Sequence, residues 1–183
     1  RYYDFTKALE CYQRATGYYE QAGKHQHKLW GLLSQSAVYD AMGEKHKSYN
    51  LLCNVKDEAK KIGNTQYVRY CLGDLIMLCI RMGESVEALN FYKEFVNNYS
   101  IDGLNPVFYA NLALLQAREK NNELALSYLK KAWNLSESVN DSINLHHLSS
   151  QIYLLQNNDS QAYSELENCV VLQNKEMLKA LRQ

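Results

Sequence analysis

A three-residue pattern recurs five times along the chain, and it constrains the fold more than any other feature of the sequence. A small residue is followed four positions later by a large one, and three positions after that by a small or apolar one. Offsets of four and seven residues place all three side chains on one stripe of an α-helix. The copies start 40, 40, 37 and 37 residues apart and read Ala8-Tyr12-Ala15, Ser48-Leu52-Val55, Ala88-Tyr92-Phe95, Ala125-Leu129-Ala132 and Ala162-Leu166-Cys169. One such triplet is weak, but five at near-constant spacing predict a repeat protein.

A turn position lies five residues before each of the last four triplets. Glycine and asparagine end a helix in the left-handed conformation at low cost, whereas lysine does so less readily. The lysine in this set is followed by two asparagines, so the turn is still expected there. The four turn positions are Gly43, Gly83, Lys120 and Asn157.

A second helix with apolar periodicity is expected before each turn. Asn105 is predicted to cap one of these helices, with Pro106 at its first position, where the missing N–H of proline costs nothing. Asp141 and Asp159 are predicted to cap the helices that they precede. Each unit is therefore helix, tight turn, helix, and stacking buries the apolar face that a single unit would expose. The four expected first helices are His27–Met42, Gln66–Met82, Pro106–Glu119 and Ser142–Gln156.

The pattern resembles the tetratricopeptide repeat, which has Gly or Ala and Tyr on its first helix and A-x3-F/Y-x2-A on its second. Gly43 and Gly83 match the turn glycine of that family. The anchor alanines are matched by Ala8, Ala88, Ala125 and Ala162, and the first-helix pairs are Ser36/Tyr39, Ile76/Cys79, Ala113/Gln116 and Ser150/Tyr153. The resemblance implies an all-α fold, a right-handed superhelical array of antiparallel helical hairpins.

The sequence departs from the family in three ways. Its period of 37–40 residues exceeds the usual length of about 34, so each hairpin carries roughly one extra helical turn. The proline that usually closes a repeat is absent, and no tryptophan stands at the first-helix position where the family has one. Long repeats of this variety are similar to those of bacterial tetratricopeptide proteins and regulatory domains and of eukaryotic adaptors. HEAT and armadillo units share the length, but the recurrent Ala-x3-Tyr and the turn glycine favour the tetratricopeptide repeat.

The resemblance implies one array over residues 1–183. It begins with the second helix of a partial repeat at 1–23, and it ends with a partial or capping helix at 173–183. The hairpins between them are expected at 24–63, 64–100, 101–140 and 141–172. Packing within and between hairpins is expected from Ala8, Tyr12, Tyr39, Gly43, Ser48, Gly83, Ala88, Tyr92, Ala125, Ala132, Tyr153 and Ala162.

In this family the first helices line the concave ligand-binding face. Trp30 and Tyr70 are the predicted anchors, because aromatic residues dominate interface hot spots; the alternative is that each packs against a neighbouring helix. A clamp for a C-terminal carboxylate is not expected, since of the aligned positions only Asn111 fits. The residues aligned with the lining positions are Trp30, Leu33, Ala37, Asp40, Tyr70, Asp74, Met77, Arg81, Val107, Asn111, Leu114, Arg118, His147, Gln151 and Leu154.

The composition excludes several functional classes. Twenty basic and twenty acidic residues balance, which argues against direct binding of nucleic acid. Five scattered cysteines without a CxxC favour a reducing compartment, and cytoplasmic localisation is expected. No apolar run reaches the roughly 18 residues of a membrane span, although a leader or a span could lie outside the segment.

No motif for catalysis, a cofactor or a metal is present. The sequence lacks a Gly-rich phosphate loop, GxSxG and HExxH. The neighbouring histidines His25 and His27 point to opposite helix faces, and His146 and His147 diverge by about 100°. The leading hypothesis is therefore a non-enzymatic scaffold that binds a protein or an extended peptide. The alternative is a sensor or self-association domain of a larger bacterial transcriptional regulator.

Overall fold

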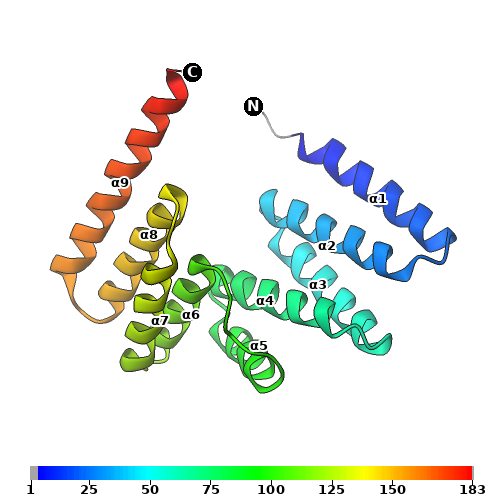
Figure 1. Cartoon of the computed structure of the whole chain (residues 1–183), viewed down its shortest axis with the longest axis horizontal. Coiled ribbons are helices and arrows are strands. Elements are labelled where there is room, and N and C mark those ends of the chain that lie inside the picture. The colour runs from blue at the N-terminus through cyan, green and yellow to red at the C-terminus, as the bar shows by residue number, and fades with distance from the viewer. Residues whose placement is uncertain (1–3, 183) are drawn as a thin grey trace. The chain divides into compact units, whose positions relative to one another are not determined.

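The computed structural model describes residues 4–182, and in this range the chain is all-helical, with nine α-helices and no strand. The helices form two compact units that divide between Ser100 and Ile101. Within each unit, helices adjacent in sequence pack against each other and run antiparallel (Figure 1). The all-α array of helical hairpins predicted from the sequence is therefore confirmed.

The first unit contains five helices of similar length. Each packs against the next in the chain, and α2 also touches α4 across α3. Their bounds are α1 Phe5–Gln21, α2 His25–Ala41, α3 Lys45–Lys61, α4 Thr65–Met82 and α5 Ser85–Asn98.

The second unit contains four helices. Here α6 packs against both α7 and α8, and α8 pairs with the long helix α9. The helix α9 is continuous, so the separate helix predicted at 173–183 is wrong; no glycine or proline interrupts the segment from Cys169 onward. The bounds are α6 Pro106–Arg118, α7 Asn122–Leu135, α8 Val139–Leu155 and α9 Asp159–Leu181.

The turns after α1, α2, α3, α4, α6 and α8 share one pattern of backbone hydrogen bonds, whereas α5 and α7 end in extended residues. In the first turn, the N–H of Lys24 donates to the Tyr19 carbonyl and that of Gly23 to the Glu20 carbonyl. These two hydrogen bonds satisfy carbonyls that are free at a helix end, and the pattern requires a residue with positive φ. Positive φ occurs in the first unit at Gly23, Gly43, Gly63 and Gly83, spaced 20 residues apart, so each of the first four helices and its turn repeat with half the predicted period.

The two remaining predicted turns use side-chain-bearing residues. Lys120 has φ 61° and Asn157 has φ 57°, so both adopt the left-handed conformation. The turn thus falls on Lys120 itself rather than on the asparagines that follow it. Asn121 contributes differently, because its N–H donates to the Gln116 carbonyl and its side-chain amide to the Gln116 side chain.

The predicted helix caps are partly confirmed. Asn105 caps α6 by accepting from the Phe108 N–H, and Pro106 takes the first helical position. Asp141 and Asp159 are not caps: Ser138 caps α8 and Asn158 caps α9. Both aspartates lie inside the first turn of their helices, where the positive end of the helix dipole stabilises a negative charge.

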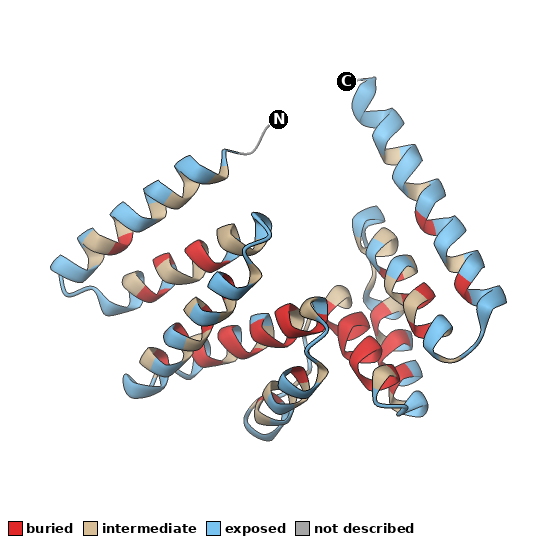
Figure 2. Cartoon of the chain, turned by 180° about the vertical axis from the view of Figure 1, so that it is seen from behind, coloured by how far each residue is buried: buried red, intermediate tan, exposed pale blue. Residues whose placement is uncertain are grey.

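The small anchors lie where the helices approach closely. Ser48, Ala88, Ala125 and Ala162 are buried, and Ala8 is half-buried on α1. The largest continuous red segments in Figure 2 lie on α4 and α6, which carry most of the buried residues. Within its own unit α4 contacts α2, α3 and α5, and α6 contacts α7 and α8, so little of the surface of either helix remains open.

No helix in residues 4–182 has both the length and the apolar character needed to cross a membrane.

Candidate functional site

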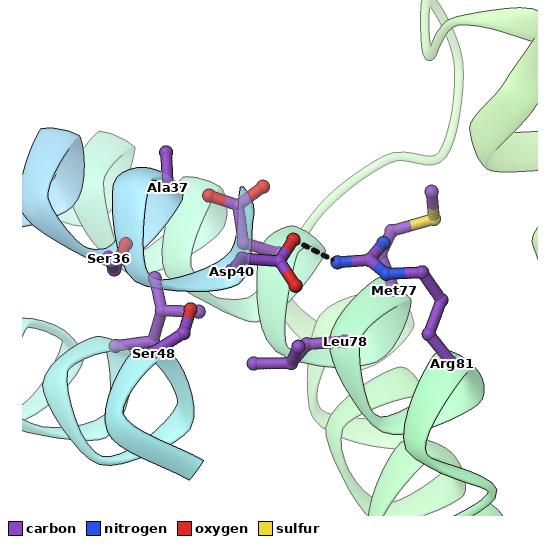
Figure 3. A pocket seen from close by; sticks show the side chains of 9 residues that line it. Ser36, Ala37, Asp40, Ser48, Met77, Leu78 and Arg81 are labelled. Atoms are coloured by element: carbon purple, nitrogen blue, oxygen red, sulfur yellow. Dashed lines mark hydrogen bonds and ion pairs between the residues drawn. The ribbon is translucent and has the colours of Figure 1, made fainter. Parts of the chain in front are cut away.

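A pocket of about 220 Å³ opens in the first unit, between α2, α3 and α4 (Figure 3). It includes five of the residues predicted to line a groove, Ala37 and Asp40 from α2 and Asp74, Met77 and Arg81 from α4. The helix α3 adds the anchor Ser48 and the large residue Leu52 that follows it by four positions. The lining residues are Ser36, Ala37, Asp40, Ser48, Leu52, Asp74, Met77, Leu78 and Arg81.

Small side chains create the space. Ser36 and Ala37 on α2 face the pocket together with Ser48 on α3, and none of them fills the gap between the helices. Ser36 turns its hydroxyl back to donate to the Leu33 carbonyl at 2.7 Å. The repeat that brings the helices together thus also leaves the cavity between them.

The buried part of the wall is apolar. Leu52 and Leu78 are almost completely buried and form one cluster with Leu75. Leu33, a predicted lining residue, packs against this cluster instead of facing the pocket. The pocket therefore offers aliphatic surface beside its charged groups.

An ion pair joins the two helices at the pocket. Arg81 Nη2 on α4 donates to Asp40 Oδ2 on α2 at 2.5 Å, and Figure 3 shows the two side chains pointing toward each other. Lys45 Nζ, at the start of α3, donates to the Arg81 backbone carbonyl at 3.1 Å. Three consecutive helices are therefore tied together beside the cavity.

Asp74 supplies a second carboxylate to the same pocket. Partial burial among the helices raises its pKa to about 6, although the side chain keeps contact with solvent. The guanidinium of Arg81 opposes this shift, and the carboxylate of Asp40 adds to it. Two carboxylates and one guanidinium line the pocket, so the charges of its lining side chains sum to −1 when all three are ionised.

The two predicted aromatic anchors are half exposed and half packed. Trp30 retains 53% exposure while meeting the Tyr12 ring edge-on, with centroids 6.1 Å apart. Tyr70 retains 50% exposure, meets the Tyr67 ring edge-on, and its hydroxyl accepts from Gln66 Nε2 at 2.9 Å. Trp30 therefore contacts the neighbouring helix α1, as the alternative predicted, whereas the contacts of Tyr70 lie within α4. Both rings still present surface, and their role as anchors stays a prediction.

The lining residues predicted on α6 are partly wrong. Asn111 is 5% exposed and Leu114 only 2%, so neither is available as surface. The Asn111 side chain is turned inward along its own helix and donates to the Val107 carbonyl at 2.8 Å. The helix α6 is apolar on nearly every side, a pattern typical of a buried helix, and this was the signal that could have corrected the prediction.

The remaining predicted residues of the second unit lie at or near the surface. Val107 and Arg118 are half-buried on α6. On α8, His147 and Leu154 are exposed and Gln151 is half-buried, with Gln151 Nε2 2.9 Å from His147 Nε2.

His146 is part of a contact that the sequence did not reveal. Its Nδ1 lies 2.5 Å from Glu165 Oε2 on α9, and its ring packs edge-on against Trp133 with centroids 4.7 Å apart. The partners are 19 and 13 residues away in sequence, so no local pattern could have indicated them. This cluster joins α7, α8 and α9.

The buried cysteines are poor nucleophiles. Burial raises the pKa of Cys71 and Cys79 to about 12 each, and burial also raises the pKa of Cys53 and Cys169. At neutral pH these four side chains are therefore thiols, and the thiolate is the form that reacts. Within residues 4–182, no three or more metal-binding side chains gather into a possible ion site.

The fold and the pocket together define a helical-repeat protein with a charged, partly apolar pocket between its helices. No protein-family model and no curated protein matches this chain. The functional argument therefore rests on the residues of the pocket and on its aromatic neighbours.

Proposed function

We propose that this chain is a non-enzymatic scaffold of the tetratricopeptide kind, which binds an extended segment of a partner protein across α2 and α4. The observation that carries this proposal is the pocket formed with α3, together with the half-exposed Trp30 and Tyr70 on the same two helices. Helical repeats use surfaces of this kind to hold other proteins.

The size of the pocket favours a side chain over a free metabolite. Its volume of about 220 Å³ lies below the roughly 300–1,000 Å³ of pockets that enclose small molecules. A single long side chain of a bound segment is of the right scale, while its main chain remains on the surface.

The spacing on α4 gives the length of the bound segment. Tyr70, Asp74, Met77 and Arg81 follow one another by three or four residues, so they share one helix face. From Tyr70 to Arg81 the helix rises about 16 Å, which about five residues of extended chain would span. On α2, Trp30 precedes Asp40 by ten residues, and on α4, Tyr70 precedes Arg81 by eleven. Because Asp40 and Arg81 pair with each other, the two aromatic residues lie at similar distances from this ion pair.

Selection from a library of short random peptides tests the proposal directly. The expected result is enrichment of a shared motif, with a Trp30→Ala, Tyr70→Ala double variant binding the selected peptides at least tenfold more weakly, as hot-spot aromatics do. In a Trp133→Phe background Trp30 is the single tryptophan, so its fluorescence should change on binding.

Exposed tyrosines elsewhere provide the control. Tyr18 on α1 and Tyr163 on α9 are more exposed than Tyr70 and lie outside the pocket. Their alanine variants should bind the selected peptides as the unchanged protein does. A library that yields no shared motif, or binding that survives loss of both Trp30 and Tyr70, would overturn the proposal.

Self-association is a second candidate function, and the exposed face of α9 favours it. Tyr163, Val170, Met177 and Leu181 are exposed and share one stripe of this helix. The first half of α9 carries the acidic residues Asp159, Glu165 and Glu167. The second half carries Lys175 and Lys179 with one acidic residue, Glu176, which pairs with Lys179, and Arg182 follows the helix. Antiparallel pairing with α9 of a second copy would bring opposite charges together.

Sedimentation equilibrium of the unchanged chain and of a Val170→Glu, Met177→Glu variant tests self-association. A dimer that becomes a monomer in the variant is the expected result. If the unchanged chain stays monomeric at high micromolar concentration, self-association through α9 is ruled out.

A further inference from the structure

The pocket between α2, α3 and α4 contains one more carboxylate than its cation can pair. Asp40 is bound to Arg81, and Lys45 is bound to the Arg81 carbonyl. Asp74 forms no ion pair with any residue in the described range 4–182. Asp74 lines the pocket and stays exposed to solvent, so a ligand in the pocket can reach its carboxylate.

The groups around Asp74 leave its charge uncompensated. On α4 the charged neighbour is Arg81, and on α2 it is Asp40, which repels a second negative charge. The helix α3 lines the pocket with the uncharged Ser48 and Leu52, and the ammonium of Lys45 at its start is bound to the Arg81 carbonyl rather than to Asp74. A cation supplied from outside would balance the pocket.

The apolar wall specifies what kind of cation fits. Leu52, Leu78, Ala37 and Met77 provide aliphatic contact beside the carboxylates. A metal ion would gain nothing from these side chains, and the carboxylates are too few to form a metal site. Lysine and arginine side chains combine a terminal charge with a long apolar stem, and they bury the stem while the charge finds a polar partner.

We propose that this pocket binds the cationic side chain of a lysine or arginine in the partner segment, with the charge at Asp74 and Asp40 and the stem against Leu52, Leu78 and Met77. This inference rests on the proposed function, because it assigns one side chain of the bound segment to one pocket. The partner segment is then basic at this position and is flanked by residues that contact Trp30 or Tyr70.

Amide chemical shifts of the isotopically labelled full chain, recorded during titration with Nα-acetyl-lysine methylamide, test the proposal. The expected result is saturable shifts at Asp40, Asp74 and Met77 in the millimolar range. The norleucine analogue has the same stem without the charge, so it should bind at least fivefold more weakly.

Two variants of the pocket should act in opposite directions. Asp74→Asn removes the free charge and should weaken binding of the lysine probe at least fivefold. Arg81→Gln frees Asp40 and should strengthen it, because both carboxylates then face the probe. A merely structural role of these residues would not produce opposite changes, and chemical shifts away from the pocket would show that each variant is folded.

The library peptides separate this inference from the proposed function. If selected peptides lack a recurrent basic residue, and Asp74→Asn leaves their affinity unchanged while loss of Trp30 and Tyr70 abolishes it, the cation pocket is wrong and the scaffold function stands. Equal binding of the lysine and norleucine probes would likewise overturn the cation pocket. A recurrent basic residue, with affinity that falls in Asp74→Asn, supports both.

Discussion

Gly31 on α2 and Thr16 on α1 approach so closely that a Cβ atom on Gly31 would lie 2.5 Å from the Thr16 hydroxyl oxygen. Thr16 is fixed in this place by its own hydrogen bonds. Its hydroxyl donates to the Tyr12 carbonyl at 2.7 Å and accepts from Gln35 Nε2 at 2.8 Å. The first two helices thus meet at a glycine, because no other residue leaves room for the threonine.

Gly31→Ala should therefore destabilise the protein by about 1–3 kcal/mol, the usual effect of overpacking. Gly17, in the interior of α1, is the matched control, since nothing lies within 4 Å of the position its Cβ would take. Gly17→Ala should stabilise by about 0.5–1 kcal/mol, as alanine is the better helix former. Urea denaturation measures both, and equal effects at the two positions would contradict the close approach.

Ala88→Trp should also destabilise the first unit, by about 1–3 kcal/mol or more. Ala88 is fully buried in α5, where a larger side chain must displace its neighbours. Val86→Trp on the same helix is the control, because Val86 is exposed and the new ring would remain in solvent. Thermal melts compare the two variants, and a melt unchanged by Ala88→Trp would show that the anchor position is misassigned.

The turn at Lys120 should be improved by glycine. A side chain in the left-handed conformation costs about 1–2 kcal/mol, and asparagine tolerates it better than lysine. Lys120→Gly is therefore expected to stabilise more than Asn157→Gly, although the greater freedom of glycine in the unfolded chain reduces both gains. The reverse change, Gly43→Ala, should destabilise through its φ of 80° alone, since no atom lies within 4 Å of the new Cβ. Chemical denaturation measures these changes. A larger gain in stability from Asn157→Gly than from Lys120→Gly would contradict this account.

Asp74 should make stability depend on pH between about 4 and 6. Its folded pKa of about 6 lies above the unfolded value near 3.8, so the folded chain holds the proton more tightly. The free energy of unfolding therefore loses a contribution as pH rises through this window. Asp74→Asn should be more stable than the unchanged protein at pH 7, and this advantage should shrink toward pH 4. If the stability difference between Asp74→Asn and the unchanged protein is the same at both pH values, the pKa of Asp74 is not raised by folding.

Most of the helices and turns could be predicted because their causes are local. Apolar spacing determines which face of α3 or α7 is buried, and the glycine at 43 or 83 determines where a helix ends. Where local signals compete, the prediction was wrong. Asp141 and Asp159 resemble caps, but the neighbouring Ser138 and Asn158 hold those positions.

The site was predicted less completely, because exposure depends on packing between helices. Alignment to the turn residue placed Asp40, Asp74 and Arg81 together on the correct faces of α2 and α4. The same alignment placed Asn111 and Leu114 on a surface, whereas both are buried in α6. Asn111 and Leu114 occupy equivalent positions relative to the turn that follows their helix, and only the helices packed around α6 differ from those around α2 and α4.

The sequence by itself determined the helical repeat, its small anchors and its left-handed turns, since these depend on residues within one or two helical turns of each other. Only the tertiary structure decided that Arg81 pairs with Asp40, 41 residues away, and that Asp74 forms no ion pair within residues 4–182. Ion pairing and pKa depend on distances and burial in space, which three packed helices define together.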